Sequence, residues 1–362
     1  PQTGETTWRE SVDREVLATR NSVGVCDVTT LGKVDVQGAD AAIFLNKIYC
    51  NGFAKLAVGK VRYGLMLRED GIAMDDGTAA RLAEDHFVVT TTTANALPVY
   101  RHMEFVRQCL FPDMDVQLIS TTEAWAQYAV AGPNSRKLLE KIVDQDMSNE
   151  AFPFMACANI TVCGGLRARL FRISFSGELA YEIAVPSIYG DALIRKIMEA
   201  GAEFDVTPYG TEALGVMRIE KGHAAGNELN GTTSAQNLGM GRMVSKIKDS
   251  IGSTLSEREG LNRENDLRQV GIKPVNPADP VPAGGHLMNA VGPVDAAHDQ
   301  GYATSAAFSP NLGHMIALGF LKDGANRIGE RMRLVSPLTD VDTEVEITSA
   351  HFIDPEGERL RA

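Results

Sequence analysis

The sequence VRYGLMLREDGIAMDDGTAARL (residues 61–82) contains two apolar runs on either side of a charged turn. The first run, Tyr63 to Leu67, ends at Arg68-Glu69-Asp70-Gly71, and the chain then returns into Asp75 and Asp76. A glycine-containing turn between two such runs predicts a β-hairpin. Because side chains alternate between the faces of a strand, one aspartate is expected to face solvent and the other to point inward. An inward carboxylate is costly unless a group such as a ligand amine hydrogen-bonds to it.

The composition limits the classes of protein to which the chain can belong. It has 362 residues, which is enough for two or three domains, and 44% of them are hydrophobic. The net charge of −12 argues against non-specific nucleic-acid binding and against anionic membrane surfaces. No apolar run approaches the ~20 residues that span a bilayer. The first residues, PQTGE, do not begin with Met, and we expect the chain to be an excised piece of a longer polypeptide.

The cysteines and histidines give no metal signature. The five cysteines are scattered and form no CxxC pair, which is typical of structural thiols in a reducing compartment, so a cytoplasmic location is expected. None of the seven histidines belongs to an HExxH motif, and we predict no metal site. The glycines of Gly239-Met240-Gly241-Arg242 lack the third glycine of a dinucleotide loop and do not follow a clear strand.

The order of the expected elements indicates an α+β fold. Helices are expected over six segments: residues 8–20, 41–48, 95–110, 135–142, 191–200 and 210–221. The polar region 246–282 contains four prolines and is expected to be a linker followed by an entry strand. Short strands separated by turns follow from residue 284 and predict a small closed β-barrel or a jelly-roll.

Single motifs leave the function open. Asp75 and Asp76 can equally be a turn pair on a solvated edge, and Glu182 can face solvent from its strand. The run Met217 to Gly222 can be a salt-bridged helix surface, and the strand Thr90 to Thr93 can reflect β-propensity alone. None of these features decides a function by itself.

Taken in order, however, the segments resemble the folate-dependent aminomethyltransferases, the glycine cleavage T-protein family. Besides the hairpin that ends in Asp75-Asp76, the similar segments are VCDVTTLGK (25–33), AVAGP (129–133), FSGE (175–178) with Glu182, RIE (218–220), and GYATS to FSP (301–310). Within the family, segments such as RYGLMLREDG and TPYGTEALGVMRIEKG resemble the C-terminal half of the α subunit of heterotetrameric sarcosine oxidase. The resemblance covers nearly the whole chain.

The resemblance implies a three-domain cloverleaf with a central channel for tetrahydrofolate and a C-terminal β-barrel or jelly-roll domain. We expect a discontinuous first domain from residues 1–50 and 135–250, and a second α+β domain from residues 51–134. A linker is expected over residues 251–274, and the barrel domain over residues 275–362.

The resemblance also implies the site residues. Asp76 matches the catalytic aspartate near the folate N10, where a carboxylate can manage the proton of the amine. Glu182 matches the glutamate that binds the pterin, whose adjacent N–H donors suit a carboxylate. Four further residues match positions that pack around the folate rings: Leu31, Tyr63, Thr90 and Phe175.

The function that the resemblance implies is the tetrahydrofolate-binding part of a sarcosine oxidase α subunit. It would convert the one-carbon unit from oxidative demethylation of sarcosine to 5,10-methylenetetrahydrofolate. The other subunits of the heterotetramer are the expected partners, and flavin and NAD are expected only in a missing segment or in those subunits. The fragment is therefore not expected to oxidise sarcosine alone. The alternatives are a free-standing folate-dependent aminomethyltransferase or demethylase, and a non-catalytic folate-binding assembly domain.

The chain departs from the family pattern at three places. Thr29-Thr30 stands where the family has Ser-His, and Phe175 stands where it has a tyrosine, so a hydroxyl is lost while the ring remains. Leu214 stands where the glycine-cleavage branch has a folate-contacting arginine. This last departure argues against glycine-cleavage activity.

Overall fold

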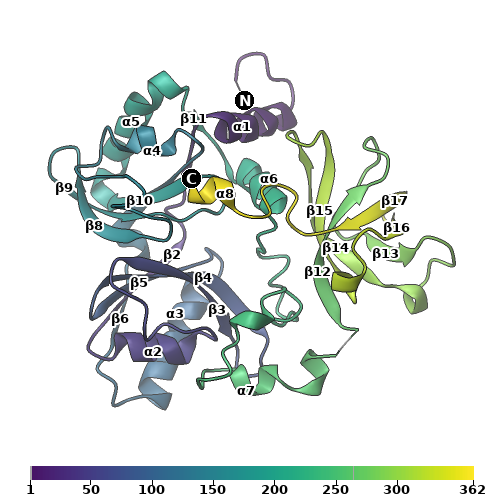
Figure 1. The fold of residues 1–362 in the computed structure, drawn as a ribbon, viewed down its shortest axis with the longest axis horizontal. Coiled ribbons are helices and arrows are strands. Elements are labelled where there is room, and N and C mark those ends of the chain that lie inside the picture. Colours follow the sequence, from purple (N-terminus) through teal and green to yellow (C-terminus); the bar gives the residue numbers. More distant parts are fainter. Residues whose placement is uncertain (1, 264) are drawn as a thin grey trace.

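Three structural units surround the centre of the molecule (Figure 1). The computed structural model describes residues 2–263 and 265–362. Two units are mixed α/β layers and the third is a β-barrel, so the expected α+β cloverleaf is confirmed. Within the described residues, no helix is both long enough and apolar enough to cross a membrane.

The first unit is a six-stranded sheet with helices packed on it. Its strands, in spatial order, are β11 (Thr207–Pro208), β1 (Gly24–Asp27), β7 (Trp125–Ala131), β10 (Ala180–Pro186), β9 (Leu166–Phe171) and β8 (Cys157–Val162). Its helices are α1 (Trp8–Asn21), α4 (Ser135–Leu139), α5 (Gly190–Gly201) and α6 (Thr211–Lys221). Strand β10 lies inside the sheet and is buried over most of its length, which makes a carboxylate on it unusual.

The second unit is a five-stranded sheet that contains the predicted hairpin. Its order is β3 (Lys60–Leu67), β4 (Ala73–Ala83), β5 (His86–Thr91), β2 (Gly32–Gln37) and β6 (Gln117–Ser120). Helices α2 (Ala41–Ile48) and α3 (Ala96–Phe105) belong to this unit, and α3 continues through a π-helical turn, Val106–Leu110. The antiparallel pairing of β3 with β4 confirms the hairpin.

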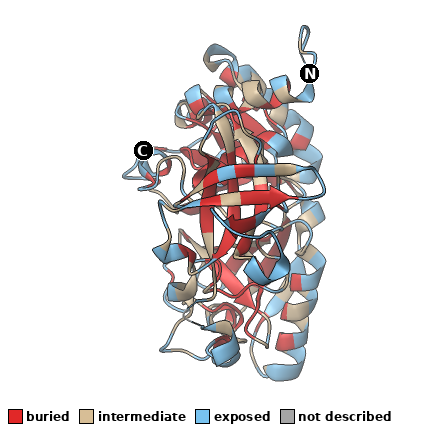
Figure 2. Cartoon of the chain, turned by 90° about the vertical axis from the view of Figure 1, so that its right-hand side faces the viewer, coloured by how far each residue is buried: buried red, intermediate tan, exposed pale blue. Residues whose placement is uncertain are grey.

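The third unit is a closed six-stranded barrel rather than a jelly-roll. Its strands close in the order β12 (Leu267–Pro274), β15 (His314–Lys322), β14 (Gly301–Ser309), β13 (His286–Asn289), β16 (Arg331–Ser336) and β17 (Val341–Thr348). Viewed from the barrel side, the strands are largely buried and the loops are exposed (Figure 2). Short helices lie before and after the barrel: α7 (Ser253–Ser256) and the C-terminal α8 (Glu358–Arg361), which returns toward the six-stranded sheet (Figure 1).

The hydrogen-bonded strands divide the chain at places other than those expected from the sequence. Strand β2 and helix α2 lie within residues 1–50, yet β2 pairs with β5 of the five-stranded sheet. Strand β7 lies within residues 51–134, yet it pairs with β1 and β10 of the six-stranded sheet. Residues 267–274 fall in the expected linker, yet they form barrel strand β12. These partners are distant in sequence, so local composition carries little information about them.

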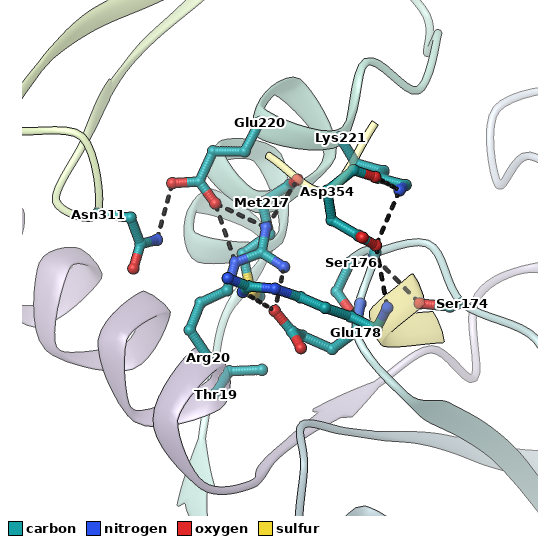
Figure 3. A network of polar contacts seen from close by, with 12 residues as sticks. Thr19, Arg20, Ser174, Ser176, Glu178, Met217, Glu220, Lys221, Asn311 and Asp354 are labelled. Carbon is teal, nitrogen blue, oxygen red and sulfur yellow. Dashed lines mark hydrogen bonds and ion pairs between the residues drawn. The ribbon is translucent and has the colours of Figure 1, made fainter. Parts of the chain in front are cut away.

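A buried polar network joins α1 and α6 of the first unit to the barrel (Figure 3). Arg20 on α1 donates to Glu178 (2.8 Å) and to Glu220 on α6 (2.6 Å), and all three side chains are at most 4% exposed. Glu220 also accepts hydrogen bonds from Ser309 Oγ (2.5 Å) and Asn311 Nδ2 (2.9 Å) of the barrel. These contacts fix the barrel against the first unit.

A second buried network joins the same two units. Arg218 donates to Glu228 (2.8 Å) and to Ser305 Oγ (2.7 Å), and Thr304 also donates to Glu228. The RIE segment on α6 and the GYATS–FSP segment on β14 therefore meet each other. Their polar residues form an interface between the two units.

Candidate functional site

The β3–β4 hairpin places the aspartate pair next to Tyr63. In its register Leu65 lies opposite Asp76, and Tyr63 lies opposite Thr78. The turn passes through Gly71 at a φ of +86°, and a Cβ there would come within 2.5 Å of the Ser256 backbone nitrogen. The turn therefore requires glycine. The pairing of the two strands brings Asp76 and Tyr63 to one face.

The phenol hydroxyl of Tyr63 orients the carboxylate of Asp76. The Tyr63 hydroxyl donates to Asp76 Oδ2 at 2.7 Å and lies 3.7 Å from the sulfur of Met240. Burial, with a smaller contribution from the negative charge of Asp75, raises the pKa of Asp76 to about 6 against the opposing effect of the hydrogen bond from Tyr63. A carboxyl with a pKa near neutrality can both accept and return a proton.

Asp75 is held in a separate hydrogen-bond network. Its carboxylate accepts from the Thr92 hydroxyl (2.7 Å), the Thr92 backbone N–H (3.2 Å) and the Asn95 amide (3.0 Å). The side chain is buried, so the expectation that one aspartate faces solvent is wrong. Asp75 and Asp76 do point to opposite faces of the strand. The face that carries Asp75, however, is covered by residues just before α3. The protein itself therefore supplies the hydrogen-bond donors that the Asp75 carboxylate needs.

Glu182 is the second unusual carboxylate. It lies on β10 and is 9% exposed, and the amide nitrogen of Gln127 on β7 donates to its Oε2. Burial raises the pKa of Glu182 to about 7, and the Gln127 hydrogen bond and the positive charge of Lys33 oppose this rise. A buried carboxylate with one protein donor keeps acceptor capacity for a ligand N–H.

The remaining predicted residues lie on the hairpin sheet, in the β1–β2 turn and beside α6. The Thr90 hydroxyl lies 2.7 Å from that of Thr78, and Leu31 forms a turn in which its N–H donates to Val28. Phe175 is 39% exposed and stacks on His223, with ring centroids 5.6 Å apart. His223 Nδ1 also lies 3.0 Å from the Phe175 carbonyl oxygen.

A continuous set of contacts connects the two carboxylates. Tyr63 lies opposite Thr78, whose hydroxyl meets that of Thr90, and Thr90 lies opposite Lys33 on β2. Lys33 in turn donates to the carbonyl oxygens of the turn that contains Leu31.

The same turn leads on to the six-stranded sheet. Thr29 hydrogen-bonds to Gln127, and Gln127 hydrogen-bonds to Glu182. Asp76, Tyr63, Thr90, Leu31 and Glu182 therefore belong to one set of contacts that crosses both sheets. Phe175 lies between β9 and β10 and contacts His223.

Lys33 and Gln127 belong to this set of contacts but were not predicted from the sequence. Lys33 and Gln127 are each 1% exposed, and both interrupt apolar strands. A long polar side chain that points inward from a strand would have indicated such a residue. The sequence of one strand alone, however, does not show which of its faces is inward.

A cavity of about 470 Å³ lies elsewhere, between α1, α6 and the barrel. Its walls include Trp8, Phe308 and Arg218, and neither Asp76 nor Glu182 lines it. Arg218 is already paired with Glu228 and Ser305. The two carboxylates with raised pKa values therefore lie outside this cavity.

Comparisons with known proteins agree with this architecture. The GCVT N-terminal domain model matches residues 1–248, and the glycine cleavage T-protein C-terminal barrel domain model matches residues 268–354. The crystal structure of glycine cleavage system aminomethyltransferase T from Bartonella henselae covers 95% of this chain and 90% of that chain, with a TM-score of 0.81. Its 24% sequence identity supports the fold alone.

Two kinds of relatives are similar in sequence. The sarcosine oxidase subunit alpha of Rhizobium meliloti (strain 1021) is 49% identical over 99% of this chain, which corresponds to 37% of that protein. This chain thus spans little more than a third of that relative. The aminomethyltransferase of Geobacillus sp. (strain WCH70) is 30% identical over 97% of this chain and 88% of that protein. On the two domain matches and this full-length similarity, the chain belongs to the glycine cleavage T-protein family.

Proposed function

We propose that the chain is the tetrahydrofolate-binding part of a sarcosine oxidase α subunit. In this proposal it converts the one-carbon unit from oxidative demethylation of sarcosine to 5,10-methylenetetrahydrofolate. The observation that carries the proposal is a pair of carboxylates, half-buried Asp76 and buried Glu182, that strand pairing and hydrogen bonds connect across two sheets. Two carboxyl groups whose pKa values approach neutrality in one region favour a catalytic site over a structural one.

Glu182 supplies the binding end of the proposed site. The pterin ring of tetrahydrofolate has neighbouring N–H donors, and a carboxylate accepts two of them in parallel. Gln127 occupies one side of Glu182 and thereby orients it. Leu31, Tyr63, Thr90 and Phe175 are proposed to pack around the rings, because flat apolar walls suit a flat ligand.

Asp76 supplies the reactive end. When bound, tetrahydrofolate supplies the amine nitrogens that capture the one-carbon unit. Asp76 holds the proton that one amine gives up, and Tyr63 keeps the carboxylate in one orientation while this happens. The residues present fit this ligand, since they offer an N–H acceptor at one end and a proton acceptor at the other.

The rest of the proposed enzyme lies outside this chain. We infer that flavin and NAD bind in other segments or subunits, and that the other subunits of a heterotetramer are the partners. The similarity to sarcosine oxidase subunit alpha supports this inference, and it extends over 37% of that relative. The five cysteines are unpaired, which is compatible with a cytoplasmic location.

A free-standing glycine-cleavage enzyme is the second candidate, and one residue argues against it. Leu214 on α6 packs against the apolar cluster of Val12, Val16 and Met217. An apolar side chain at this position offers no positive charge to a folate carboxylate. The glycine-cleavage reaction is therefore not part of the proposal.

Calorimetric titration of the chain with tetrahydrofolate tests the proposal. Glu182→Gln is expected to weaken binding by about ten- to hundredfold, because a hydrogen bond to a charged acceptor contributes about 1.5–3 kcal/mol. Glu140→Gln, at an exposed position, is the matched control and is expected to bind as the unmodified chain does. Absence of binding by the unmodified chain, or equal affinity in Glu182→Gln, would contradict the proposal.

A further inference from the structure

Lys33 is a buried cation in the middle of the proposed site. It lies on β2, is 1% exposed, and is paired with Thr90 of β5 in the antiparallel ladder. Its ammonium group turns back toward the preceding turn and donates to the carbonyl oxygens of Thr29 (2.8 Å) and Leu31 (3.0 Å). An ammonium has three donors, and burying a cation is costly unless it is paired. Two neutral carbonyl groups compensate its charge only in part.

The turn that Lys33 holds is also bonded to the strand beside Glu182. The Gln127 backbone N–H donates to Thr29 Oγ1 at 3.0 Å, and the Thr29 hydroxyl lies 3.3 Å from the Gln127 carbonyl oxygen. The side-chain amide of the same Gln127 donates to Glu182. The hydrogen bonds therefore run from Lys33 through Thr29 and Gln127 to Glu182, across the boundary between the two sheets.

We propose that Lys33 is a positioning residue that favours the ionised form of Glu182 and holds it in one orientation, so that Glu182 can accept ligand N–H groups. This inference rests on the proposed function for the identity of the ligand, but not for the state of Glu182. Lys33 acts on Glu182 through its charge, and on the orientation of Glu182 through the turn at Thr29. It touches neither the one-carbon unit nor Asp76.

The charges around the two residues agree with this role. Burial lowers the pKa of Lys33 to about 8, while the negative charges of Glu182, Glu123 and Asp27 oppose that change. Lys33 is thus mostly protonated at pH 7. Burial raises the pKa of Glu182 to about 7 even though the Gln127 hydrogen bond and the positive charge of Lys33 lower it.

The other groups near Glu182 carry no compensating charge at neutral pH. Burial raises the pKa of Cys26 to about 11, and burial also raises that of Tyr209, so both are neutral. Arg20 lies near Tyr209 but is engaged by Glu178 and Glu220. Removal of the Lys33 charge therefore raises the pKa of Glu182 and leaves it protonated at neutral pH.

Carbon-13 NMR of glutamate-labelled protein tests this directly and without any ligand. The Glu182 carboxyl resonance is assigned by its absence in Glu182→Gln. In Lys33→Met and Lys33→Gln, the Glu182 titration is expected to move to higher pH by about one unit, at the lower end of the effect of a nearby opposite charge. Lys137→Met, which removes an exposed ammonium, is the matched control and is expected to leave the Glu182 titration unchanged. An unchanged Glu182 titration in both Lys33 variants would overturn the inference.

A reciprocal measurement covers the case in which the Lys33 variants do not fold. Nitrogen-15 NMR of lysine-labelled Glu182→Gln reports the Lys33 ammonium directly. Loss of the Glu182 charge is expected to lower the pKa of Lys33, because the interaction of the two charges is mutual. If the pKa of Lys33 is the same in Glu182→Gln as in the unmodified chain, the inference is overturned.

Tetrahydrofolate calorimetry of the Lys33 variants separates this inference from the proposed function. A rise of about one in the pKa of Glu182 lowers its ionised fraction at pH 7, and binding is expected to weaken about fivefold. Near pH 9 Lys33 is neutral in the unmodified chain as well, and the affinities are expected to converge. If the carboxyl titrations behave as described but no protein binds tetrahydrofolate, the proposed function fails while the role of Lys33 stands.

Discussion

Asp76→Asn is expected to lower the rate of 5,10-methylenetetrahydrofolate formation by about a hundred- to ten-thousandfold, the range of one positioned general base. The amide has nearly the shape of the carboxylate and can still accept a hydrogen bond from Tyr63, so the site should keep its form. An amide cannot hold the proton that an amine releases. Affinity for tetrahydrofolate is expected to stay within about threefold, because the Glu182 end of the site is unchanged.

The measurement is the capture of labelled formaldehyde into methylenetetrahydrofolate, after subtraction of the spontaneous reaction without protein. In the unmodified chain the rate is expected to fall as the pH drops through about 6, where Asp76 becomes protonated. The residual rate of Asp76→Asn is expected to lack this pH dependence. Asp70→Asn, in the partly exposed turn of the same hairpin, is the control and should leave the rate unchanged. A rate in Asp76→Asn equal to that of this control would remove Asp76 from the chemistry.

Arg20→Met is expected to lower the free energy of unfolding by about 3–5 kcal/mol, which is the cost of removing one partner from a buried ion pair. The guanidinium lies between Glu178 and Glu220, whose side chains are 4% and 0% exposed (Figure 3). Methionine fills much of the same space but leaves both carboxylates without this cation. Because Glu220 also bonds to Ser309 and Asn311, the loss is expected to loosen the barrel as well.

Urea unfolding, followed by circular dichroism and by tryptophan fluorescence, measures this effect. Arg195→Met is the control, because Arg195 pairs with Asp191 at the surface, where both side chains are more than three-quarters exposed. Surface pairs of this kind contribute little, so the control is expected to unfold with the unmodified chain. An Arg20→Met midpoint equal to that of Arg195→Met would show that the buried network does not hold the units together.

The hairpin shows which parts of the site were visible in the sequence. The alternation of apolar and polar residues predicted strands β3 and β4, and it placed Asp75 and Asp76 on opposite faces. It did not show what covers each face. The Thr92 and Asn95 groups that bury Asp75 follow the next strand, β5, and their position depends on the packing of α3. Burial on both faces is a tertiary property that a period of two residues does not reveal.

The barrel and the interface networks show the same limit. The short strands after residue 284 predicted a barrel, but residues 251–274, which include β12, were expected to be a linker because the surrounding region is polar and contains four prolines. Its partners, β15 and β17, lie more than 40 residues later in the chain. Likewise, Glu220 and Ser309 were recognised only as parts of separate motifs. Their hydrogen bond joins residues 89 positions apart.

A crystal structure of the chain with bound tetrahydrofolate tests the central claim most directly. We expect the pterin ring to lie within hydrogen-bond distance of Glu182, its faces to contact Leu31 and Thr90, and the amine end to face Asp76. Tetrahydrofolate bound in the cavity between α1, α6 and the barrel, with both carboxylates free of contact, would contradict it.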